Sequence, residues 1–203
     1  TGAGDFDMMC EHWPSYTEGD TTYIAELGGD GSVISLGASG IVGLSDYYVP
    51  KYWADANPGF KTWEDLNNYK AEFATIESGG KGRLIGCPIP GWNCYDQVRL
   101  DMLGIDFVAD ELGSEAAALA EAQGAYKRQE AFLVYLWEPH WAMGAMDLVP
   151  VKLPANKPCD TWTEEKGYKD CGLGYWPATG WSEDITFNSG RPAFWNDPEN
   201  AKA

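Results

Sequence analysis

The chain of 203 residues can form one large domain or two small lobes, and its 44% of hydrophobic residues suffices for a real core. The formal net charge of −17 argues against nucleic acid and anionic membranes as partners, because both bind through basic patches. An acidic surface suits a protein that meets cations, although it also serves solubility alone, and no apolar run approaches the ~18 residues of a membrane span.

Short apolar runs alternate with helical patterns along the chain, which is typical of an α/β fold. In the first half we expect strands at 6–13 and 32–37, an extended segment at 44–53, a helix that Thr62 caps with Asp65 in a capping box, and a strand from Gly82. In the second half we expect a helix from Asn93 or Cys94, a helix at 115–129 capped by Ser114, a buried strand at 131–137, a helix with Pro139 in its first turn, strands at 147–154 and 183–188, and the start of a helix at Asp197. This order predicts parallel strands joined by crossover helices.

The cysteines suggest disulfides and an oxidising compartment. Cys87 and Cys94 are close in sequence, as are Cys159 and Cys171, and glycine or proline flanks each pair, which predicts two local disulfides. Cys10 is left over in an apolar run, and we expect a buried thiol there. A zinc site is the weaker alternative, because no C-x-x-C pair occurs and the two histidines are not at ligand spacing.

Tryptophans lie at the carboxyl ends of three expected strands. Trp13, Trp92 and Trp137 each come just after an apolar run, and ligands of parallel sheets bind at the carboxyl ends of strands. Any one of them is explained by packing, but three together predict a site for a small organic cation, because indole faces attract cations. The stretch GCPIPGWNC holds Trp92 inside one cysteine pair, and the backbone N–H groups of Asn93 and Cys94 at a helix start favour an anion beside it.

Three stretches, GDFDMMCEHWPSY, GCPIPGWNC and VYLWEPHWAM, resemble motifs of the glycine betaine/proline (quaternary amine) substrate-binding proteins of ABC importers. The resemblance extends from about residue 3 to about residue 188. It implies an α/β, two-lobed periplasmic-binding-protein fold of type II, which binds by lobe closure and makes or breaks no bond. It also implies a periplasmic (extracytoplasmic) protein without cofactor or metal that delivers its ligand to an ABC transporter permease. We place lobe 1 at 1–47 with 181–203 and lobe 2 at 48–180.

The same resemblance implies the ligand-binding residues. Trp13, which precedes Pro14, matches one wall of the family's tryptophan cage, and Trp92 matches the tryptophan of the disulfide loop. The amides of Asn93 and Cys94 match those that follow that tryptophan. Trp137 matches the first tryptophan of the W-x-P-x-W strand end.

The sequence departs from the family pattern in three respects. Glu138 replaces the usual hydroxyl residue, and Glu11 lies near the Trp13 wall. If either carboxylate points into the site, it would suit choline or, when protonated, would donate to the oxygen of trimethylamine N-oxide. If it points outward, it faces solvent. Trp181 is an additional tryptophan that can form a fourth wall. The family's opening strand and helix and its closing helices are missing, so we expect a fragment.

Other functions fit parts of the pattern. Tryptophan-rich clefts with acids also occur in carbohydrate-binding modules and glycoside hydrolases, and Glu138 and Glu183 are a conceivable pair of catalytic carboxylates for a hydrolase. A sensor protein built on the same binding fold is a further alternative. A nucleophilic site is poorly supported, because His12 and His140 adjoin tryptophans without a G-x-S-x-G motif. Calcium binding by an acidic loop such as 160–170 stays open, although its spacing matches no known ligand loop. The choice among glycine betaine, choline, carnitine, dimethylsulfoniopropionate and trimethylamine N-oxide stays open as well.

Overall fold

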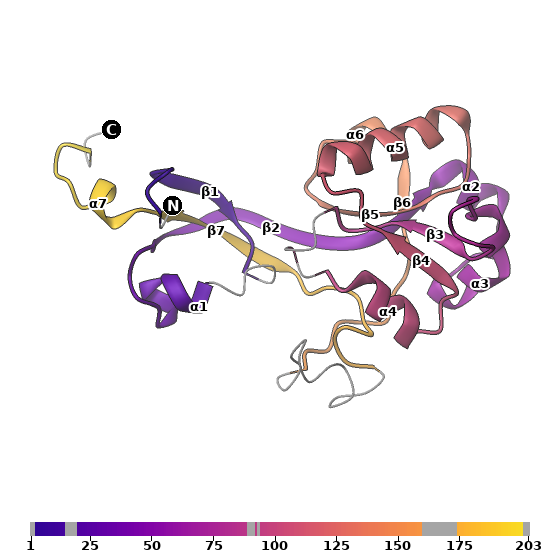
Figure 1. Cartoon of the computed structure of the whole chain (residues 1–203), viewed down its shortest axis with the longest axis horizontal. Coiled ribbons are helices and arrows are strands. Elements are labelled where there is room, and N and C mark those ends of the chain that lie inside the picture. Colours follow the sequence, from indigo (N-terminus) through magenta and orange to yellow (C-terminus); the bar gives the residue numbers. More distant parts are fainter. Residues whose placement is uncertain (1–2, 15–19, 89–91, 93, 160–173, 201–203) are drawn as a thin grey trace. The chain divides into compact units, whose positions relative to one another are not determined.

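The computed structural model (Figure 1) describes residues 3–14, 20–88, 92, 94–159 and 174–200. The chain divides into two compact units, unit 1 with Thr1–Gly43 and Glu183–Ala203 and unit 2 with Leu44–Ser182. Strand β2 (Ile34–Pro50) contributes its first part to unit 1 and its last part to unit 2. None of the described helices is long and apolar enough to cross a membrane.

Unit 1 is built on an antiparallel sheet in the order β1-β7-β2, with β1 at Met8–His12 and β7 at Asp184–Gly190. Its other described elements are α1 (Asp20–Tyr23), η2 (Ala25–Leu27) and α7 (Pro192–Trp195). The strands expected at 6–13 and 183–188 are therefore confirmed, and the one expected at 32–37 is part of the longer β2.

Unit 2 contains a mixed sheet. Its strands follow the order β2-β5-β3-β4, and β6 pairs with the end of β2. The strands are β3 (Gly82–Ile85), β4 (Phe107–Asp110), β5 (Leu133–Glu138) and β6 (Leu148–Pro150). β3 is parallel to β4 and β5, as the strand–helix–strand order predicted, but β2 runs antiparallel to β5 and β6, so the prediction of parallel strands is wrong there.

Helices cover both faces of this sheet. Figure 1 shows α5 (Glu115–Arg128) and α6 (Ala142–Ala145) on one side and α4 (Asp96–Met102) on the other. The remaining helices of unit 2 are α2 (Lys51–Ala56), η3 (Trp63–Asp65), α3 (Leu66–Tyr69) and η4 (Lys70–Glu72). Small residues of α5, such as Ala118 and Ala122, lie in one buried cluster with Val134 and Leu136 of β5, because alanine lets a helix approach a sheet closely.

Several predicted boundaries are wrong. The extended segment ends at Pro50, and α2 begins at the next residue, Lys51. The helix after the cysteine loop begins at Asp96, because Tyr95 has a left-handed backbone (φ 54°) that no helix residue adopts. Pro139 precedes α6 instead of starting it, consistent with the extended backbone that proline imposes on the residue before it, here the last residue of β5. At the C-terminal end the helix is α7, and turns follow it at Asp197.

Capping explains the two helix starts that were predicted correctly. The Thr62 capping box with Asp65 is present at the start of η3. At α5, the Ser114 hydroxyl oxygen accepts the Ala117 N–H at 3.2 Å, which satisfies a donor that has no partner within the helix.

We expect Ser114→Ala to lower the free energy of unfolding by about 1 kcal/mol, the usual cost of a lost N-cap. Urea denaturation followed by circular dichroism measures this change. Ser114→Asp is the matched control and should retain most of the stability, because a carboxylate also caps. Equal midpoints for wild type and Ser114→Ala would contradict the capping role.

Candidate functional site

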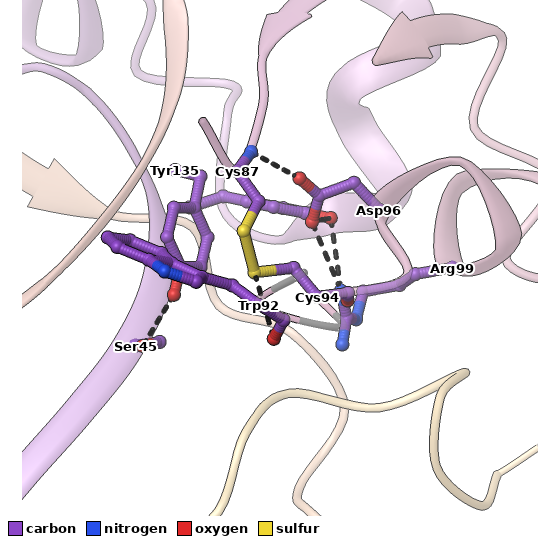
Figure 2. The surroundings of a disulfide bond; sticks show 8 residues. Ser45, Cys87, Trp92, Cys94, Asp96, Arg99 and Tyr135 are labelled. Atoms are coloured by element: carbon purple, nitrogen blue, oxygen red, sulfur yellow. Dashed lines mark hydrogen bonds and ion pairs between the residues drawn. A yellow bond between two sulfur atoms is a disulfide. The ribbon is translucent and has the colours of Figure 1, made fainter. Parts of the chain in front are cut away.

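The disulfide loop begins where β3 ends. Cys87 and Cys94 form the predicted disulfide, and both are buried. Trp92 lies between them in the sequence and is half-buried, and Figure 2 shows its indole beside the disulfide. The neighbouring residues 89–91 and Asn93 lie outside the described part of the chain, so the predicted anion contact of the Asn93 N–H stays a prediction.

Trp92 and Trp137, two of the predicted walls, lie against each other in unit 2. Their ring centroids are 5.4 Å apart and their planes make an angle of 78°, an edge-to-face arrangement. Trp137 also contacts Tyr135, at 6.0 Å between ring centroids. Two half-buried indoles at nearly right angles form a corner with two aromatic surfaces.

The pairing of β2 with β5 decides which side chains share the face of this corner. Trp137 lies opposite Ser45, and Tyr135 lies opposite Tyr47, so all four side chains point to one face of the sheet. The hydroxyl groups of Ser45 and Tyr135 are hydrogen-bonded at 3.1 Å. Neither tyrosine was predicted from the sequence, although each lies two residues from Ser45 or Trp137 on the same strand, a spacing that indicates the same face.

Behind the disulfide lies a buried ion pair that the sequence analysis also missed. Arg99 is fully buried, and its Nη1 lies 3.4 Å from Oδ1 of Asp96, one helical turn earlier in α4. Burial raises the pKa of the Asp96 carboxyl, whereas Arg99, the Cys87 N–H and the Tyr47 hydroxyl oppose that rise. An Asp-x-x-Arg pair in the first turns of a helix was the available sequence signal.

Aromatic rings enclose the Arg99 guanidinium. Its central carbon lies 3.7 Å from the ring centroid of Trp181 and 4.8 Å from that of Trp176. Trp181, the predicted fourth wall, is only 6% exposed. One face of its indole is therefore engaged with a cation that belongs to the protein itself.

Glu138 lies on the other face of the sheet from Trp137, because neighbouring residues of a strand point in opposite directions. The Tyr48 hydroxyl donates to its carboxylate at 3.3 Å, and Asp46 is on the same face. Burial raises the pKa of the Asp46 carboxyl to about 7, and the nearby Glu138 adds to the rise, although the Tyr47 N–H and Arg99 oppose it. The structure thus separates Glu138 from the Trp92–Trp137 corner.

Trp13 and Glu11 are held together in unit 1. The indole N–H of Trp13 donates to Oε1 of Glu11 at 2.7 Å, so this carboxylate orients the tryptophan. The Trp13 ring lies so close to Gly43 that a Cβ there would come within 2.1 Å of it. Glycine at position 43 therefore makes room for the indole.

The remaining predictions concern cysteines and metals. Cys159 is disulfide-bonded, and its predicted partner Cys171 lies outside the described residues, as does the loop at 160–170. Cys10 is exposed, so its predicted burial is wrong: β1 carries no buried residue. Within the described ranges, no three His, Cys, Asp or Glu side chains are grouped to hold a metal ion.

We expect Asp46→Asn to stabilise the protein at pH 8 and to have much less effect at pH 4. The pKa of about 7 in the folded state exceeds the ordinary 3.8, so the folded state binds this proton more tightly and the free energy of unfolding falls as the pH rises between these values. Each pKa unit corresponds to about 1.4 kcal/mol, so the effect is on the order of a few kcal/mol. Denaturant melts at both pH values measure it, and the same difference at both would contradict this assignment.

The chain matches known transport proteins. The family model described as the substrate binding domain of ABC-type glycine betaine transport systems matches residues 2–200. The trimethylamine N-oxide-binding protein of Pelagibacter ubique (strain HTCC1062) is 28% identical over 148 residues, which cover 70% of this chain and 46% of that protein.

Solved structures show the same fold at lower identity. ProX from Borrelia burgdorferi is 21% identical with a TM-score of 0.59, covering 99% of this chain and 62% of ProX. Lactococcal OpuAC complexed with glycine betaine is 20% identical with a TM-score of 0.56, covering 99% of this chain and 64% of OpuAC. A choline-binding protein of an ABC transporter, complexed with choline, is 18% identical with a TM-score of 0.54, covering 98% and 59%.

The chain thus spans less than two thirds of the length of these relatives. Its mixed α/β architecture is that of the type II periplasmic binding proteins. The chain belongs to the family of substrate binding domains of ABC-type glycine betaine transport systems.

Proposed function

We propose that the protein captures a small methylated ammonium compound outside the cytoplasm and delivers it to an ABC transporter permease. Family members are the substrate-binding components of such transporters rather than enzymes. The proposal includes a periplasmic location, no cofactor, and no nucleic-acid partner, in keeping with the net charge of −17.

The observation that carries the proposal is the perpendicular pair of Trp92 and Trp137. A trimethylammonium group placed in this corner meets one indole surface on each of two sides. In the described part of the chain, no arginine or lysine lies over either ring, although the His140 ring packs edge-on against Trp137 at 4.6 Å between centroids. Trp176 and Trp181, in contrast, already stack with Arg99. The corner therefore has aromatic surface left for an external cation.

Two indoles alone are too weak for a transport receptor. Each contributes about 0.5–2 kcal/mol to binding a cation, whereas a micromolar complex needs about 8 kcal/mol. We therefore propose that the two compact units are the two lobes and that Trp13, oriented by Glu11, adds a wall when the lobes close on the ligand. Trp181 belongs to the proposed site through Tyr135, which it contacts at 5.4 Å between ring centroids and which in turn contacts Trp137.

The negative end of the ligand requires hydrogen-bond donors. We propose that the N–H groups of Asn93 and Cys94 supply them, in keeping with their position just before α4. Relatives are named for binding trimethylamine N-oxide, glycine betaine and choline, which share a methylated ammonium group and differ at the other end. We propose that this protein recognises the methylated ammonium group that these ligands share.

We expect a thermal-shift screen to show stabilisation by at least one methylated ammonium compound and by none of a panel of oligosaccharides. Calorimetry on the compound that binds should then show at least tenfold weaker binding for Trp92→Ala and Trp137→Ala. Trp141→Ala is the matched control, because Trp141 is 59% exposed and close in sequence to Trp137. Stabilisation by oligosaccharides alone would replace this proposal with a carbohydrate-binding function.

Glu138→Gln should change the affinity for glycine betaine less than twofold, because Glu138 lies on the opposite face of the sheet from Trp137. Removing a carboxylate from the neighbourhood of the betaine carboxylate would instead strengthen binding. A large gain in affinity, measured by calorimetry at constant ionic strength, would show that Glu138 faces the ligand.

A further inference from the structure

We propose that the buried Asp96–Arg99 ion pair is a positioning element that holds the disulfide loop, and with it Trp92 against Trp137, independently of the Cys87–Cys94 bond. The inference deepens the proposed function, since it takes Trp92 as a wall of the ligand site. Figure 2 shows the disulfide between the Trp92 indole and this ion pair.

The ion pair is bonded to both ends of the loop. Oδ2 of Asp96 accepts the backbone N–H of Cys87 at 2.6 Å, where the loop begins. Nη1 of Arg99 donates to the backbone carbonyl of Cys94 at 3.0 Å, where the loop ends. The two hydrogen bonds therefore fix the same two residues that the disulfide joins, but through the main chain.

The ion pair is in turn anchored to two other parts of unit 2. The Tyr47 hydroxyl in β2 donates to Oδ1 of Asp96 at 2.8 Å and lies 3.2 Å from Nη1 of Arg99. Nε of Arg99 donates to the carbonyl of Thr179 at 2.8 Å, and the Trp181 ring lies over its guanidinium. Through Asp96 and Tyr47, the loop is thus connected by hydrogen bonds to the sheet that carries Trp137.

Stability alone does not account for this arrangement. Buried ion pairs cost desolvation, and well-packed apolar residues often replace them without loss of stability. Here Nη2 of Arg99 has no hydrogen-bond partner among the described residues, an additional cost. Apolar side chains cannot bind both the Cys87 N–H and the Cys94 carbonyl, so positioning explains why charges lie at these sites.

The test uses protein labelled with 5-fluorotryptophan, in which Trp92→Phe assigns the fluorine resonance of Trp92. We expect Arg99→Lys to shift and broaden this resonance in the ligand-free protein and to raise the dissociation constant of the bound ammonium compound at least tenfold. Lysine keeps the charge but cannot bond to Cys94 and Thr179 together. The double variant Cys87→Ser/Cys94→Ser should leave the Trp92 resonance sharp. The triple variant that adds Arg99→Lys should give a broader line than Arg99→Lys alone.

Leu100→Ala is the control for general destabilisation, because Leu100 is fully buried in the same helix and does not contact the loop through polar groups. It should lower the melting temperature without moving the Trp92 resonance. The proposal is overturned if Arg99→Lys and Leu100→Ala affect the resonance equally, or if removing the disulfide alone releases Trp92.

Two further provisions keep the outcomes separate. Should Arg99→Lys not fold, Asp96→Asn takes its place; it weakens the bond to Cys87 and should broaden the same resonance, and an unchanged line would overturn the proposal. Should the wild type bind no ammonium compound, the proposed function fails, while the fluorine spectra still decide whether the ion pair positions Trp92.

Discussion

The antiparallel pairing of β2 with β5 gives unit 2 two chemically different faces. Alternate residues of both strands point to opposite sides, so Tyr47, Tyr135 and Trp137 face the disulfide loop while Tyr48 and Leu136 face α5. A shift of one residue in this pairing would exchange the two sets. The aromatic corner, the hydrogen bond from Tyr47 to Asp96 and the separation from Glu138 all depend on this register.

The tryptophans of unit 2 serve two purposes, and the position of a single guanidinium distinguishes them. Trp176 and Trp181 stack with buried Arg99 and so stabilise a cation that the fold itself provides. Trp92 and Trp137 contact each other and are half-buried, which leaves indole surface for a ligand. The same attraction between a cation and an indole face thus acts inside the protein and, as we propose, on its ligand.

The side chains of Asp96 and Arg99 form hydrogen bonds to the main chain of the disulfide loop. Cys87 and Cys94 are bonded through their backbone N–H and carbonyl to Asp96 and Arg99. A site prepared before binding loses less conformational entropy when the ligand arrives. In the receptor function that we propose, holding the loop in this way would contribute directly to affinity for a small molecule with few contacts.

The sequence by itself determined the α/β class, the capped starts of η3 and α5, the Cys87–Cys94 disulfide and the resemblance that the family match confirmed, because these depend on local patterns or short motifs. It also indicated Trp92, which comes after β3, and Trp137, which lies at the carboxyl end of β5. Only the tertiary structure decided that these two rings meet, that Arg99 lies under Trp181, and that Glu138 points away from Trp137. Those facts depend on strand register and on contacts between residues far apart in the chain, such as Arg99 and Trp181, which are 82 positions apart, and no local pattern encodes them.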